Sequence, residues 1–228
     1  MSDLMTFDFP PYRLSGVVYG TLMNDPQSLS GLGDQVNEAP YKASPRAPIL
    51  YVKPHNTLAG PGSVLRLPAG NESLEVGAAL GMVIGRTACR VPVDQAMDYI
   101  AGYTIVNDVS LPHDSFYRPS VRLKARDGFC PIGPCVTPST EIVTPDELEV
   151  SVYIDNKLAQ QSSTAGRVRS VAQLLADVTD FMTLQAGDIL MLGAVAGAPK
   201  VSNGQHVKIE ISGLGSLENT VANEEVLS

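Results

Sequence analysis

A dense run of ionisable side chains occupies residues 107–134, with the sequence NDVSLPHDSFYRPSVRLKARDGFCPIGP. The run begins at the end of a strand-like stretch, YTIVND at 103–108, and its charged residues are interspersed with Pro, Gly and Ser. Because polar loops that leave a rigid β core often carry binding and catalytic groups, this run is a candidate site. A solvated loop with surface salt bridges is the alternative interpretation of the same pattern.

Two side chains in this run suit acid–base and anion chemistry by their type. His113, in LPHDSF, is a candidate general base because of its residue type, with a surface loop position as the alternative. Arg118, in FYRP, carries a guanidinium that can fork onto a carboxylate, although a structural surface role fits it equally well. Because they share the run, we assign Tyr117, Arg126 and Asp127 to the same substrate-binding group.

The bulk composition excludes several classes of protein. The chain has 228 residues, 44% of them hydrophobic, which suits one domain with a substantial core. Its net charge of -8, with no Lys/Arg cluster, argues against a nucleic-acid partner. The longest apolar stretch, 76–85, is too short to cross a bilayer, and no basic leader precedes an apolar run at the N-terminus. We therefore expect a cytoplasmic protein without a membrane partner.

Strand patterns dominate the chain and predict a β-rich α+β fold. Residues 1–16 are predicted to form an N-terminal arm, and residues 17–228 a single catalytic domain. The polar segment 23–48 is typical of a surface lid or mobile loop, with a disordered insertion as the alternative. Helices are expected at 93–102 and after Ser170, a suitable N-cap. The predicted strands are 17–22, 49–53, 76–85, 103–108, 148–155, 189–193 and 206–213.

Four separated motifs resemble the fumarylacetoacetate hydrolase superfamily. They are KPHNTLAG, DYIAGYTIVNDVS, SFYRPSVRLKARDGFCPIGP and DFMTLQAGDILMLG, in register from residue 17 to 224. Within that superfamily, the sequence is similar to isomerases and decarboxylases of 4-hydroxyphenylacetate degradation. The resemblance implies a mixed β-sandwich roll of the fumarylacetoacetate hydrolase C-terminal-domain type. It also implies a divalent metal, usually Mg²⁺, that chelates a 2-oxo or enol carboxylate and stabilises the enolate.

The resemblance also implies roles for individual residues. It places a metal carboxylate on Asp108 and, on Lys124, the lysine that lies near the substrate's carbonyl or carboxylate. We therefore expect Asp108, Lys124 and His113 to be the catalytic group. The stretch LAQQSSTAG matches a substrate-side segment, which adds three expected substrate contacts: Gln160, Gln161 and Thr164.

The sequence departs from the family pattern at the metal site. Where the family carries Glu-x-Glu on one strand face, this chain has Gly77 and Ala79. Asp108 alone is a poor Mg²⁺ site, because that ion usually takes one or two carboxylates together with substrate oxygens. Glu75 lies one step along the same face and is either a replacement ligand or a surface charge at the strand end. We therefore expect Mg²⁺ to bind this chain weakly or not at all.

Two further elements of the family's catalytic machinery are altered. The lid His and Glu that form an acid–base pair fall on Ser28 and Gly31, and the GTP turn reads GAV at 193–195. Two interpretations remain open. In the first, the chain is an isomerase/decarboxylase subunit acting on 2-hydroxyhepta-2,4-diene-1,7-dioate or 5-oxopent-3-ene-1,2,5-tricarboxylate. In the second, it is a non-catalytic partner of a metal-bearing homologue.

A third interpretation, an acylpyruvate-type carbon–carbon hydrolase, predicts an intact Glu-x-Glu pair and a lid His, neither of which the chain has. We expect the chain to form a homodimer or a complex with a homologous C-terminal-type subunit. The expected ligand in each case is an unsaturated oxo-dicarboxylate or tricarboxylate.

Overall fold

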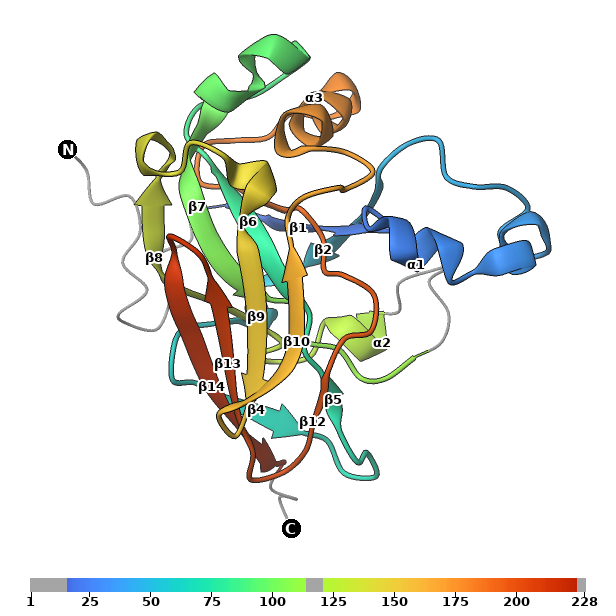
Figure 1. Cartoon of the computed structure of the whole chain (residues 1–228), viewed down its shortest axis with the longest axis vertical. Coiled ribbons are helices and arrows are strands. Elements are labelled where there is room, and N and C mark those ends of the chain that lie inside the picture. The colour runs from blue at the N-terminus through green and yellow to red at the C-terminus, as the bar shows by residue number, and fades with distance from the viewer. Residues whose placement is uncertain (1–15, 114–120, 225–228) are drawn as a thin grey trace.

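Two β-sheets pack face to face in the computed structural model, which describes residues 16–113 and 121–224 (Figure 1). The larger sheet is mixed: β1 pairs with β11, and β3 with β8, in parallel, while its other pairs are antiparallel. Its seven strands, in spatial order, are β2 (Ile49–Lys53), β1 (Val18–Leu22), β11 (Ile189–Met191), β6 (Ala78–Ile84), β7 (Ile100–Asn107), β8 (Cys130–Pro138) and β3 (Leu58–Ala59).

The second sheet has five strands, and a short two-stranded ribbon lies near it in Figure 1. In spatial order the five are β10 (Lys157–Ser163), β9 (Glu149–Ile154), β13 (His206–Ile211), β14 (Gly215–Asn223) and β4 (Val64–Leu67). The ribbon pairs β12 (Lys200–Val201) with β5 (Leu74–Glu75). The predicted β-rich α+β fold with a mixed sheet is thus confirmed.

Helical segments are few and mostly short. The α-helices are α1 (Pro26–Ser30), α2 (Val121–Lys124) and α3 (Val171–Phe181). The 3-10 helices are η1 (Gly33–Asn37), η2 (His55–Thr57), η3 (Val93–Tyr99), η4 (Ser139–Glu141) and η5 (Pro145–Glu147). In the part of the chain that the structure describes, no helix is long and apolar enough to cross a membrane. The predicted arm at 1–16 lies, except for Gly16, outside the described residues.

The strand β6 is buried on both faces, which explains why it lacks the usual alternation of polar and apolar residues. Leu80 and Met82 point into the main core between the two sheets. Ala79 and Val83 point the other way and join a second apolar cluster with Val106 of β7. The small residues of this strand therefore allow close packing on its second face.

Local signals account for two other elements. Ser170 caps α3 as predicted, because its side chain accepts a hydrogen bond from the Gln173 backbone N–H at 3.2 Å. The helix expected at 93–102 is shorter and tighter: η3 ends at Tyr99, and Ile100 already pairs with Ile84 in the sheet. Tertiary pairing has overridden the helical spacing there. The segment 23–48 contains α1 and η1 and projects beside the sheets (Figure 1).

Candidate active site

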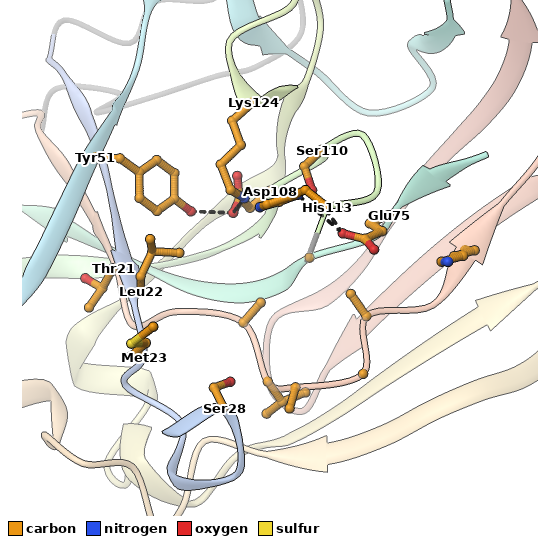
Figure 2. Close-up of a pocket in the computed structure, with 17 residues that line it drawn as sticks. Thr21, Leu22, Met23, Ser28, Tyr51, Glu75, Asp108, Ser110, His113 and Lys124 are labelled. Atoms are coloured by element: carbon orange, nitrogen blue, oxygen red, sulfur yellow. Dashed lines mark hydrogen bonds and ion pairs between the residues drawn. The ribbon is translucent and has the colours of Figure 1, made fainter. Parts of the chain in front are cut away.

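A cavity of about 310 Å³ lies where β6 begins and β7 ends. One wall comes from β2 and from the chain that follows β7, and the other comes from β1, α1 and the loop 194–198. Figure 2 shows Tyr51, Asp108 and Lys124 together on the first wall, with Ser28 of α1 across the cavity. Asp25 fixes that second wall, because its carboxylate accepts hydrogen bonds from the N–H groups of Ser28 and Ala196.

The β6–β7 pairing continues beyond the strands and sets the register of the site. Ala78 pairs with Asn107, the Asp108 N–H donates to the Gly77 carbonyl at 2.8 Å, and Glu75 exchanges two backbone hydrogen bonds with Ser110. Directly opposed residues of an antiparallel pair point to the same side of the sheet. Asp108, Ser110 and Glu75 therefore share one face, and all three line the cavity.

Three side chains converge on the buried Asp108 carboxylate. Lys53 Nζ lies 2.7 Å from Oδ1, and Lys124 Nζ lies 2.9 Å from Oδ2. The Tyr51 hydroxyl donates a hydrogen bond to Oδ2, and Lys124 Nζ lies 5.0 Å from the centre of the Tyr51 ring. Two ammonium groups against one carboxylate give this buried group a formal charge of +1, which favours an anionic ligand.

Lys53 is held by backbone as well as by charge. Its Nζ donates to the carbonyls of Val109, Lys124 and Phe129 at 3.0, 2.8 and 2.9 Å, and its side chain is fully buried. An ammonium group has three N–H donors, which these three carbonyls and the Asp108 carboxylate share. Lys53 therefore ties β2 to the segment after β7 and to the end of α2, and places Asp108 and Lys124 relative to each other.

Burial and neighbouring charges shift the pKa of Asp108 in opposite directions. Burial alone would raise the pKa of its carboxyl group, but Lys53 and Lys124, with hydrogen bonds from Lys53 and Tyr51, hold that pKa well below its usual range. The pKa of the Tyr51 hydroxyl is raised well above its ordinary value by burial and then by the charge of Asp108. Tyr51 is thus a hydrogen-bond donor and Asp108 a fixed anion at neutral pH.

A second polar group lies further along the same face. Glu75 Oε2 accepts a hydrogen bond from Ser110 Oγ at 3.4 Å and lies 3.9 Å from His113 Nδ1. His113 Nδ1 is also 2.9 Å from the Leu111 carbonyl. Lys200 of β12 lies opposite Glu75 in the β12–β5 pair and also lines the cavity. The cavity therefore has a cationic end at Lys124 and a carboxyl group at Glu75.

The family model described as fumarylacetoacetate (FAA) hydrolase C-terminal matches residues 17–222. This chain belongs to the fumarylacetoacetate hydrolase family. The "4-hydroxyphenylacetate degradation bifunctional isomerase/decarboxylase" of Escherichia coli is 36% identical to it over 211 residues. That alignment covers 92% of this chain and 48% of the relative, so the chain spans about half the length of that curated protein.

Two solved structures of the fumarylacetoacetate hydrolase family share this fold. The 2-hydroxyhepta-2,4-diene-1,7-dioate isomerase from Mycobacterium marinum aligns with a TM-score of 0.75 at 28% identity, covering 92% of this chain and 76% of that one. Maleylpyruvate hydrolase from Sphingobium sp. SYK-6, in complex with manganese (II) and pyruvate, aligns with a TM-score of 0.75 at 26% identity. That alignment covers 92% of this chain and 71% of that one. Relatives of this chain are thus isomerases, decarboxylases and hydrolases.

The residues present do not fit a divalent metal of the kind found in the manganese complex. A Cβ atom built at Gly77 would lie 2.6 Å from the Asp108 carbonyl oxygen, so the backbone leaves no room there for a glutamate. Ala79 packs in the second apolar cluster instead of lining the cavity. Both oxygens of Asp108 already contact ammonium groups. Across residues 16–113 and 121–224, no cluster of three His, Cys, Asp or Glu side chains could hold a metal ion.

The three expected catalytic residues, Asp108, Lys124 and His113, all line the same cavity. It places the other described substrate-binding candidates elsewhere. Arg126 pairs with Glu224 at 3.6 Å, and Asp127 accepts a hydrogen bond from the Asn56 side chain at 2.7 Å. Tyr117 and Arg118 lie outside the described residues.

The candidates from LAQQSSTAG lie in or just after β10 and do not line the cavity. Gln160 supports its wall from outside, donating to the carbonyls of Ala196 and Gly197 at 3.1 and 3.0 Å. Gln161 bonds to Glu149, and Thr164 accepts from the Leu148 N–H at 2.8 Å. Their contacts maintain the second sheet and the loop 194–198.

Sequence reasoning missed Lys53 and Tyr51. Both lie on β2 in the sequence ILYVKP, two residues apart and therefore on the same strand face. A lysine at the end of an otherwise apolar strand was the available signal, since lysine is rarely fully buried unless it is paired. Their partner Asp108 is more than fifty residues away, and only the folded sheet brings the three together.

Proposed function

We propose that this chain is an isomerase or decarboxylase of aromatic catabolism that acts on an unsaturated 2-oxo or 2-hydroxy dicarboxylate through an enolate. The supporting observation is the buried cluster of Lys53, Lys124, Asp108 and Tyr51, which carries a formal +1 charge at one end of the cavity. The names of the relatives provide the substrate class.

Lys124 is the residue of this cluster that offers its charge to the cavity. It lines the cavity, whereas Lys53 is enclosed behind Asp108 by three carbonyls. A fixed ammonium group in a partly dry site stabilises negative charge that develops on a substrate oxygen, because it does not have to reorient during the reaction. Double-bond migration in a 2-hydroxydiene passes through such an oxygen anion, and so does loss of carbon dioxide from a carbon that is conjugated, through a double bond, with the oxo group.

Asp108 and Tyr51 then act on Lys124 itself. The carboxylate forms an ion pair with Lys124 at 2.9 Å and orients it at the cavity, and the Tyr51 ring lies near its ammonium group. A carboxylate whose pKa is held low is a weak base, so Asp108 is better suited to orientation than to proton abstraction. We assign Asp108, Tyr51 and Lys53 as positioning residues and Lys124 as the group that contacts substrate.

The test is the loss of ultraviolet absorbance of 2-hydroxyhepta-2,4-diene-1,7-dioate with the purified chain, with added magnesium and with chelator. We expect turnover above the uncatalysed rate that survives chelation. The Lys124→Met variant should lower kcat about 10²–10³-fold, as loss of an oxyanion donor does in other enzymes. The exposed Lys157→Met variant is the control and should retain full activity.

Because the chain spans about half the length of the curated relative, the experiment also tests whether a second, homologous subunit is required. No turnover by the chain alone, followed by turnover when a metal-bearing homologous subunit is added, would make the chain a non-catalytic partner. No turnover of either the dienedioate or 5-oxopent-3-ene-1,2,5-tricarboxylate under any of these conditions would overturn the proposal.

A further inference from the structure

Glu75 is the second carboxyl group of the cavity, and the cluster around Lys124 does not use it. Its side chain is 20% exposed, and its carboxyl group is oriented by Ser110 Oγ at 3.4 Å and by His113 Nδ1 at 3.9 Å, both on Oε2 (Figure 2). A carboxyl group that is aimed into a cavity and held by neighbours has the geometry of a proton donor or acceptor.

The register of the sheet gives the spacing between the two polar groups. Glu75 lies opposite Ser110, and Asp108 is two residues before Ser110 on the same face. Diagonal neighbours of this kind are about 7 Å apart. Gly77, two residues after Glu75 and opposite Asp108, has no side chain and lines the cavity, so no side chain at that position separates the two groups.

That spacing matches the two reacting ends of a conjugated 2-hydroxy-2,4-dienoate. Its isomerisation removes a proton from the oxygen on the second carbon and adds one to the fifth carbon. Three bonds separate those carbons, which places them about 4 Å apart when trans and planar, as in a trans peptide. With an ammonium group at the oxygen and an acid about 3 Å from the far carbon, the two protein groups must be several ångströms apart.

We propose that Glu75 is the acid that protonates the fifth carbon of a 2-hydroxy-2,4-dienoate whose oxygen is held by Lys124. The assignment rests on the proposed function and specifies its proton donor. The enol O–H bond breaks and its proton goes to water, a carbon–oxygen double bond forms, and the remaining double bond moves to the third and fourth carbons. The Glu75 O–H bond breaks as the new C–H bond forms, and water then reprotonates Glu75. No electrons are gained or lost.

The surroundings of Glu75 are consistent with a proton donor. Burial raises the pKa of its carboxyl group. The charged groups that face it are His113 after β7, Lys200 on β12 and Lys124 on α2; these lower the pKa, as does the hydrogen bond from Ser110, but burial dominates. A raised pKa keeps a larger share of the carboxyl groups protonated near neutral pH.

The experiment follows the reaction in heavy water by NMR, which shows where deuterium enters the product. We expect the native chain to place deuterium on the fifth carbon. Glu75→Gln keeps the shape but cannot donate a proton from oxygen, so its rate of labelling at that carbon should fall about 10²–10⁴-fold. Residual product should then carry deuterium on the third carbon, where an unassisted dienolate can also be protonated. Glu75→Asp should retain labelling at the fifth carbon, at a lower rate.

Glu72→Gln, in the exposed loop before β5, is the matched control and should behave as the native chain does. Affinity for 2-oxoadipate, which lacks the diene, should change less than about threefold in Glu75→Gln, because Lys124 still holds the oxo acid. The inference is wrong if Glu75→Gln keeps the native rate and labelling position, if Glu75→Asp labels as Glu75→Gln does, or if Glu75→Gln loses 2-oxoadipate binding as well. If the native chain itself gives no turnover, the proposed function falls first and this inference falls with it.

Discussion

The Asp108 carboxylate pairs with two ammonium groups, those of Lys53 and Lys124, so the three charges stabilise one another. Lys53 is fully buried, and Asp108 is 6% exposed. Removing one member of a buried ionic group is costly, because the remaining charge loses its compensation in a medium that solvates it poorly. Lys53 also donates hydrogen bonds to three buried backbone carbonyls, which would lose their donor without it.

Lys53→Met should therefore destabilise the chain, although methionine has a similar volume. We expect the free energy of unfolding to fall by about 3–5 kcal/mol, since Asp108 loses a counter-charge and three carbonyls lose their donor. Urea denaturation followed by circular dichroism measures the change. Lys157→Met, at the exposed start of β10, should change stability by less than about 0.5 kcal/mol. A change below 1 kcal/mol at Lys53 would contradict the structural role given to it.

The lowered pKa of Asp108 also predicts how stability depends on pH. The ordinary pKa of aspartate, 3.8, applies in the unfolded chain, and the folded value lies well below it because of Lys53 and Lys124. The folded state is then favoured fully above 3.8, and this contribution is lost as the pH falls below 3.8 towards the folded value. Urea midpoints of the native chain and Asp108→Asn should converge as the pH is lowered from 6 to about 2. A constant difference across that range would refute the linkage.

At the scale of elements, the backbone just before β6 (Ala78–Ile84) leaves no room for a metal-binding glutamate. Gly77 is pressed against the backbone that follows β7, with the Asp108 carbonyl 2.6 Å and the Asp108 Cβ 3.1 Å from the position of an added Cβ. This close approach lets the Gly77 carbonyl accept the Asp108 N–H and fixes the register of the site. A glutamate at this position requires a different path for one of the two chains.

Gly77→Ala should therefore destabilise the protein by about 1–3 kcal/mol, the usual cost of forcing atoms into a packed site. Gly31→Ala is the control: that residue ends α1 with φ -64, a helical value that alanine adopts readily. We expect it to change the unfolding free energy by less than about 0.5 kcal/mol. Thermal unfolding of both variants measures the difference, and equal stability of Gly77→Ala and the native chain would show that the strands can separate there.

Local patterns in the sequence predicted the elements better than they predicted the site. The alternation in HVKIEI placed Val207, Ile209 and Ile211 on one buried face, and the fold has them there. The spacing of 93–102 indicated a helix, but pairing with β6 drew its last residues into β7. Tyr51 and Lys53 are site residues only because β2 lies near the end of β7, and no local pattern encodes that proximity.

At the scale of the whole molecule, charge is distributed unevenly. The chain carries a net charge of -8, yet the buried group at the cavity carries +1 from Lys53, Lys124 and Asp108. Surface carboxylates further than about 10 Å away are screened by salt and add little attraction for a cation inside the cavity. A divalent ion at Asp108 would face two ammonium groups within hydrogen-bonding distance of that carboxylate.

Calorimetric titration of the chain with Mg²⁺ or Mn²⁺ should thus reveal no site tighter than about 1 mM, the weak end of protein sites for such ions. A second titration, with 2-oxoadipate already bound, tests whether substrate oxygens complete a site that the protein lacks, and we expect the same result. Asp108→Asn is the matched variant. A one-to-one isotherm tighter than 1 mM that disappears in Asp108→Asn would make Asp108 a metal ligand. Lys53 and Lys124 would then have to move away from it when the ion binds.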